Sequence, residues 1–255
     1  MLISGLLFTF TFLCWQYHLE RVQTDAHSYN PIFTPPPLLK LSIWRRANGR
    51  FAAMMVIAFS NWSSFLAWIF WVQLFYQNYK HYTPLQTSLR LLPMFVSGIL
   101  CNIIAGLFAS RIPLVWITGV GTLATTSACL IFALMPPTFS YWAFAFPAIF
   151  MSAMGADLIS SAGTNFIAKF ALPHEQSVAG ALFMTMTQLG TTVGVVVSTT
   201  VFKGVARRVL PEGKDPILMY RAAQWTAFGF GVVGKSFFSL FLFFFGNCFL
   251  CSDCR

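Results

Sequence analysis

Asp157 is the only acidic residue in this 255-residue sequence that lies deep within a long apolar run, residues 141–166. A charged side chain at the centre of a bilayer costs about 2.5–3.5 kcal/mol on insertion scales, so such a residue normally faces a cavity or a partner. We therefore predict that Asp157 binds a proton or a cationic substrate. The alternative is a neutral or ion-paired carboxyl that packs its helix against another.

Three amide side chains within apolar runs are further candidates for the lining of a polar cavity. Asn165 lies eight positions after Asp157, near the same helical face. Gln188 and Asn61 lie in two other apolar runs. For Asn165 and Gln188 we favour the simpler interpretation, hydrogen bonding between helices, which is worth about 0.6–2 kcal/mol per pair.

Other patterns predict helix packing rather than chemistry. Gly190 and Gly194 form a small-xxx-small pair, which is typical of close helix approach. Residues 229–234 read G-x-G-x-x-G, but they lie in a hydrophobic run and no acid follows about 20 residues later. We expect no enzyme activity, no metal and no cofactor, because the histidines show no ligand spacing: they are His18, His27, His81 and His174.

The composition indicates lipid as the main solvent of this chain. Charged residues make up 9%, against roughly 25% in an ordinary soluble domain, and hydrophobic residues make up 57%. A soluble fold of this size could not bury so much apolar surface, which excludes a soluble enzyme, a secreted disulfide scaffold and a disordered chain. The net charge of +9 does not indicate nucleic acid, because the basic residues sit at the ends of apolar runs.

Seven apolar runs approach or exceed the roughly 20 residues that a helix needs to cross a bilayer core. Lipid offers no partner to an open backbone and the runs do not alternate with period two, so each is predicted to be a helix. The fold class is therefore an all-α polytopic membrane protein with seven transmembrane helices. The runs are residues 2–17, 51–76, 89–109, 112–135, 141–166, 178–202 and 222–250.

The first run is interpreted as a membrane span rather than a signal peptide. It has no basic n-region and no small-x-small cleavage site before residues 18–21. The loop 18–50 is dense in Lys and Arg, which favours a cytoplasmic position for that loop and an outside N-terminus. An odd number of spans with this orientation suggests a piece of a longer protein.

The segment 82–93 reads YTPLQTSLRLLP and has the features of a helix entry. Pro84 suits a first helical turn, Thr83 can cap it, and Pro93 can bend the span. The segment resembles the "Y-S-P-L-x-A-G-x-x-x-L-P" pattern of the 14-span drug:proton antiporter branch of the major facilitator superfamily.

Further segments, in the same order along the chain, resemble fungal members of this branch. Residues Gly106 to Arg111 lie where these proteins keep a degenerate copy of the gating-loop motif "G-x-L-a-D-R-x-G". Ser110 replaces the motif's acidic residue and Pro113 its second glycine, which weakens the expected gating role. The resemblance covers roughly residues 1–233, and its other segments are 155–157, 165–167, 176–181, 187–194 and 220–225.

The resemblance implies a domain organisation and a function. Residues 51–233 would form the C-terminal six-helix bundle, 1–22 a central linking helix and 23–50 a cytoplasmic loop. The implied activity is proton-coupled efflux of small amphipathic compounds by alternating access, with Gly106 and Arg111 in a cytoplasmic gate. The expected partners are the lipid bilayer, a small-molecule substrate, protons, and a missing N-terminal bundle or a second copy, in the plasma or the vacuolar membrane.

The C-terminal stretch 234–255 departs from the resemblance. Gly-Lys-Ser at its start is what an unspliced donor site would encode, so we hypothesise a retained intron or a gene-prediction error. If the stretch is genuine, its three cysteines are palmitoylation candidates: Cys248, Cys251 and Cys254.

Two alternatives to a transporter remain open. One is a transport-inactive remnant of such a protein, since half of the cavity wall would be missing. The other is a seven-helix retinal protein with Lys235 in the seventh run, against which stands the absence of an acidic counter-ion in the run 89–109.

Overall fold

The structure, a computed structural model, describes residues 49–108, 112–136, 141–172, 175–211, 213 and 215–249, together with 7, 11–12, 14–19, 21–22 and 44. Within these ranges all regular structure is helical. The helices are α2 (Arg50–Leu74), a π-helical turn η2 (Phe75–Tyr79), α3 (Pro84–Phe108), α4 (Leu114–Leu134), α5 (Tyr141–Phe170), α6 (Gln176–Val209) and α7 (Ile217–Phe249).

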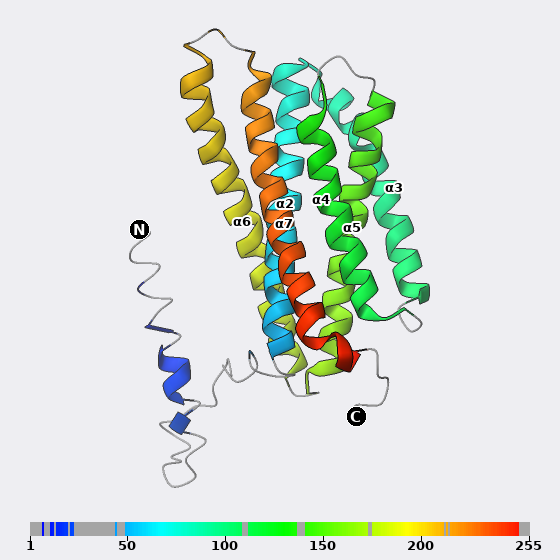
Figure 1. Ribbon diagram of the computed structural model, residues 1–255, viewed down its shortest axis with the longest axis vertical. Coiled ribbons are helices and arrows are strands. Elements are labelled where there is room, and N and C mark those ends of the chain that lie inside the picture. Colours follow the sequence, from blue (N-terminus) through cyan, green and yellow to red (C-terminus); the bar gives the residue numbers. More distant parts are fainter. Residues whose placement is uncertain are drawn as a thin grey trace.

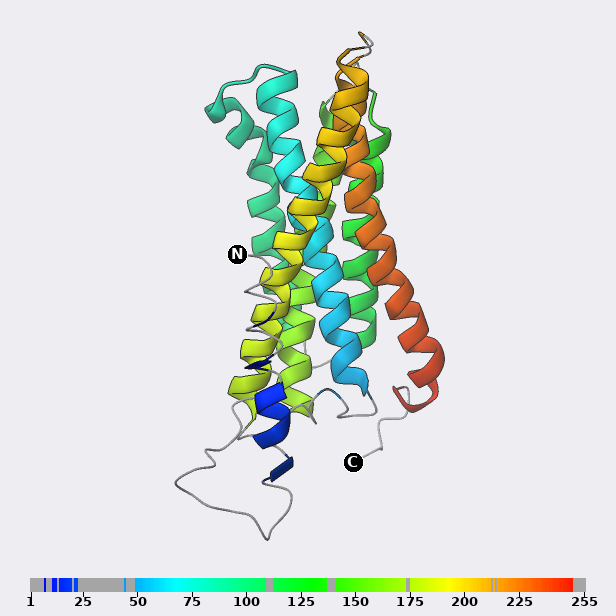
Figure 2. The ribbon, with the colours of Figure 1, turned by 90° about the vertical axis from the view of Figure 1, so that its left-hand side faces the viewer.

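The long helices run alternately up and down one axis, as the short loops between them require (Figures 1 and 2). Among the described residues, α2 with η2, α3, α4, α5 and α6 are long and apolar enough to cross a membrane, and α7 lies alongside them (Figure 1). The prediction of an all-α membrane protein is confirmed. The first predicted span lies mostly outside the described residues, and its described residues, 7, 11–12 and 14–17, are helical.

The start of α3 shows why this helix is longer than its apolar run. The Thr83 hydroxyl accepts the backbone N–H of Gln86 at 3.3 Å, and the Gln86 side chain accepts the backbone N–H of Thr83 at 3.2 Å. This reciprocal capping box satisfies two N–H groups that a helix start otherwise leaves open, and Pro84 at the first helical position has no N–H to lose. The cap predicted at Thr83 is confirmed.

The centre of the bundle is built where small residues let helices approach. On α5, Gly155 lies against Gly121 and Thr125 of α4, and no space for a side chain remains between the two backbones. On α6, Gly190 and Gly194 lie against the backbone of α2 at Phe59 and Ser63. The Ser63 hydroxyl also donates to the Gly190 carbonyl at 2.8 Å, so a hydrogen bond reinforces this contact.

The edges of the bundle are much less buried than its centre. In the most apolar stretch of each helix, 67% of the residues of α4 and 56% of those of α2 are buried, against 17% for α3 and 22% for α6. Helices α3 and α6 form the two opposite edges in Figure 1. These two edges therefore have the surface on which lipid or further protein can pack.

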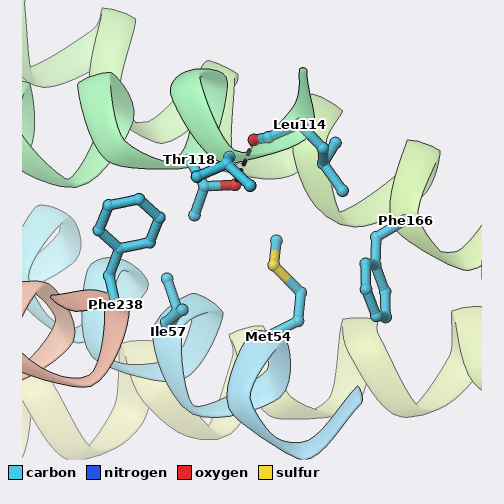
Figure 3. Close-up of a pocket in the computed structure, with 7 residues that line it drawn as sticks. Met54, Ile57, Leu114, Thr118, Phe166 and Phe238 are labelled. Atoms are coloured by element: carbon cyan, nitrogen blue, oxygen red, sulfur yellow. Dashed lines mark hydrogen bonds between the residues drawn. The ribbon is translucent and has the colours of Figure 1, made fainter. Parts of the chain in front are cut away.

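A small apolar space of about 20 Å³ lies among α2, α4, α5 and α7 (Figure 3). Its one polar side chain in view, Thr118, donates its hydroxyl to the Leu114 carbonyl at 2.9 Å. The space is about the size of one water molecule and its walls are apolar, so it is a packing feature rather than a ligand site.

One wall of this space comes from α7 beyond Gly234. Phe238 is 9% exposed and faces Met54 and Ile57 of α2 (Figure 3). The stretch that we attribute to a retained intron thus continues α7 as far as Phe249 and contributes to the packing. Its origin remains a hypothesis.

Candidate functional site

Asp157 faces a groove of about 490 Å³ between α2, α3 and α5. Only Asp157 and Asn102 are polar side chains among the residues that line it, apart from the indole of Trp62. Its walls are otherwise apolar and aromatic: Phe65 from α2, Met94, Phe95, Ile99 and Ile103 from α3 with Gly98 among them, and Ala153 and Ala156 from α5.

One turn of α3 receives the carboxyl group. A Cβ atom placed on Gly98 would lie 2.8 Å from the Asp157 Oδ2 atom, so the glycine leaves room for the carboxyl against the helix. Asn102, one turn further along α3, donates to the Gly98 carbonyl at 2.9 Å and lines the same groove as Asp157. An amide nitrogen has two N–H donors, so Asn102 has a second donor available to the carboxyl.

The surroundings of Asp157 are suited to a proton or a cation. The carboxyl is partly buried, and none of the described residues that line its groove is basic. An ionised carboxylate in an apolar site is favoured by a cation beside it, and aromatic faces such as those of Trp62 and Phe65 also attract cations. The arrangement can therefore bind a proton or the positive group of an amphipathic molecule.

The other three predicted polar candidates do not line this groove. Asn165 is partly buried further along α5, and Gln188 is exposed on α6. Asn61 is 2% exposed in α2, and its amide nitrogen has no hydrogen-bond partner among the described residues. The structure therefore brings Asp157 together with Asn102 and Gly98, which the sequence reasoning missed, and their roles remain predictions.

The predicted gating residues are only partly described. Gly106 lies exposed near the end of α3, with open space where a side chain would begin. Arg111 and Ser110 lie outside the described residues, and Pro113 immediately precedes α4. Lys235 is exposed on α7, which does not favour an enclosed Schiff-base pocket at that residue.

Comparisons with known proteins give a consistent family. The family model described as Major Facilitator Superfamily matches residues 1–195. The chain is similar to MFS-type transporter 1 of Pyricularia oryzae, with 30% identity over 90% of this chain and 39% of that protein. It is also similar to the efflux pump terJ of Aspergillus terreus, with 28% identity over 70% of this chain and 34% of the pump.

The chain is also similar to a bacterial protein, over a comparable share of both sequences. The methylenomycin A resistance protein of Bacillus subtilis shows 28% identity over 64% of this chain and 34% of its own length. The chain thus spans between a third and two fifths of the length of these curated relatives.

Proposed function

This chain belongs to the major facilitator superfamily, and from that premise we propose that it forms the C-terminal half of a proton-coupled efflux transporter. Members of this superfamily are transporters rather than enzymes, and the chain is an integral, multi-pass membrane protein. The observation that carries the proposal is the partly buried carboxyl of Asp157 in an apolar groove with no basic side chain in its lining.

Asp157 would take up a proton when the groove opens to one side and release it, or exchange it for a cationic substrate, when the groove opens to the other. The neutral carboxyl is favoured in an apolar surrounding and the ionised carboxylate is favoured by a cation, so proton and cation compete for one group. Alternating access then requires two bundles that rock about a site near the midplane.

The second bundle would pack on the exposed edges of this one. The low burial of α3 and α6 supports this arrangement, because both edges have apolar surface that the described helices do not cover. The covering partner would be the remaining part of a longer chain or a second copy. The competing function is a transport-inactive remnant of such a transporter.

A flux assay in proteoliposomes tests the proposal. We would reconstitute the chain alone and together with an N-terminal half from a relative, impose a pH gradient, and follow release of a fluorescent lipophilic cation. Asp157→Asn is the test variant. Asp215→Asn is the matched control, because Asp215 lies outside the described helices and its side-chain oxygen, which accepts the Ile217 N–H at 3.0 Å, is kept in asparagine.

We expect gradient-driven flux in the wild type and the Asp215→Asn variant, and its loss in Asp157→Asn. Equal flux in all three proteins would overturn the role of Asp157. An absence of flux in every reconstitution, with the protein intact, would favour the inactive remnant.

A further inference from the structure

A second groove lies between α3 and α5, nearer the start of both helices. Its charged residue is basic, whereas that of the first groove is acidic. The second groove measures about 580 Å³, and Arg90 is the only charged residue among the described residues that line it. Four of its apolar residues are open to the surroundings: Leu89 is 60% exposed, Leu92 54%, Val96 51% and Trp142 72%. Its remaining lining residues are Pro93, Tyr141, Phe146 and Phe150.

Tyrosine rings hold the Arg90 guanidinium in place. Its central carbon lies 4.1 Å from the centroid of the Tyr82 ring, 5.4 Å from that of Tyr141 and 5.9 Å from that of Tyr76. The Tyr141 hydroxyl donates to the Arg90 carbonyl at 2.6 Å, which fixes the start of α5 to α3. Ring faces orient a guanidinium without consuming its five N–H donors.

These donors have no anionic partner within the groove. None of the described residues that line the groove is acidic, and the sequence has no acid between Asp25 and Asp157. A guanidinium fork matches the geometry of phosphate oxygens and binds them in a bidentate manner. The site therefore has an ordered positive group but lacks the negative group that such an arrangement normally binds.

The position of Arg90 along α3 places its charge at the level of lipid headgroups. The 25 residues of α3 extend about 37 Å, which is longer than a hydrocarbon core of about 30 Å. Arg90 follows Pro84 by six residues, or about 9 Å along the helix. Helical side chains tilt toward the N-terminus, so the guanidinium reaches back toward the near membrane surface.

We propose that this groove binds one anionic phospholipid. The lipid phosphate binds the Arg90 guanidinium. One acyl chain lies along Leu92, Val96 and Phe150, which line the groove beside Arg90. The charge selects a lipid with a net negative headgroup, and the apolar groove selects a long acyl chain over a soluble anion. This site is independent of the transport role proposed for Asp157.

Native mass spectrometry of the purified chain, with defined lipids added, tests this site. Phosphatidylglycerol and phosphatidylcholine with identical acyl chains are compared, and soluble glycerol phosphate serves as a headgroup without a chain. Arg90→Gln removes the charge. Val96→Phe fills the groove and leaves the charge in place. Arg208→Gln is the matched control, since Arg208 is exposed in the last turn of α6.

We expect the wild type and Arg208→Gln to retain one phosphatidylglycerol at least tenfold more tightly than phosphatidylcholine. Arg90→Gln should lose this preference, and Val96→Phe should weaken retention of both lipids. Equal retention of both lipids by the wild type would overturn the site, as would an unchanged preference in Arg90→Gln. Displacement of the lipid by glycerol phosphate would show a soluble-anion site instead. If Arg90→Gln does not fold, the comparison of the two lipids on the wild type and the Val96→Phe variant still test the lipid site.

Discussion

Helices α3 and α4 are equally apolar, yet 17% of one and 67% of the other is buried within the structure. The difference lies in residue size. The buried face of α4 contains Gly121, Ala124, Thr125 and Ala128, which let α5 and α7 approach. The exposed face of α3 consists of large side chains such as Ile99, Ile103 and Leu107.

Hydropathy alone therefore does not separate a helix that faces protein from one that faces lipid. Within a membrane, helix association depends on close packing rather than on transfer from water, so small residues mark the interface. Both grooves lie along α3, on the sparsely covered side of the molecule. The two sites that we propose therefore lie where the helices of this chain are packed most sparsely.

The largest effect is expected for a side chain inserted into the contact between α4 and α5. Gly155→Leu should destabilise the fold by about 3 kcal/mol or more, because its side chain would overlap the backbone of α4. Thermal unfolding in detergent measures the loss. Gly106→Ala, in open space on α3, is the control and should be neutral or slightly stabilising. Equal stability of the two variants would contradict the described interface.

A smaller difference in stability is expected when an isoleucine is replaced by alanine in the buried part of α5 and in the exposed part of α3. Ile149 is completely buried in α5, and Ile103 is 54% exposed on α3. Ile149→Ala should cost about 2–4 kcal/mol through lost packing, whereas Ile103→Ala should cost less than about 0.5 kcal/mol. Chemical unfolding of both variants checks this ratio, and similar costs would place α3 inside the protein rather than at its edge.

A selective effect on function is expected at the Asp157 groove. Gly98→Ala places a methyl group 2.8 Å from the carboxyl oxygen and forces that flexible group to move. The displaced carboxyl would lose one hydrogen bond with the bound cation, about 1.4 kcal/mol. Cation affinity would then fall about tenfold, with little change in the stability of the fold. Equilibrium binding of a lipophilic cation measures it, with Gly229→Ala as the control on an open face of α7. Unchanged affinity would separate Gly98 from the site.

The smallest effect is expected at the capping box of α3. Thr83→Ala removes the hydroxyl that accepts the Gln86 N–H, at a cost of about 1 kcal/mol. Hydrogen exchange of the first turn of α3 should rise in this variant, while exchange in α4 stays unchanged. If exchange does not change in the first turn, the cap does not stabilise this helix end.

The sequence predicts the helices well, because bilayer thickness fixes how long an apolar run must be. Each of the six predicted runs beyond residue 50 coincides with one described helix. The groove beside Asp157 is also predictable, since a mid-membrane acid normally faces a cavity or a partner, while the role of Asp157 stays a prediction. Its neighbours are not predictable, because Gly98 and Asn102 reach it only through the packing of α3 on α5. The one signal of these neighbours in the sequence is the spacing of Gly98 and Asn102, which places them one helical turn apart on the same face of a helix.

The surroundings of Arg90 are another feature that the sequence does not predict. In the sequence it is one basic residue in a helix entry, and its neighbours Tyr76 and Tyr141 come from two other helices. Only the tertiary arrangement gathers these rings around one guanidinium. A residue such as Asp157, which is marked by its charge within an apolar run, can be found from one sequence. A site such as that of Arg90, whose residues come from several helices, can be recognised only from the fold.

Infrared difference spectroscopy of the carboxyl group tests the role of Asp157 most directly. The purified chain would be titrated in lipid vesicles and then exposed to a lipophilic cation, with Asp157→Asn as the reference. We expect a protonated carboxyl band that disappears when the cation binds and that is absent from the variant. A band that does not change when the cation binds, or that persists in Asp157→Asn, would contradict the exchange of proton and cation at Asp157.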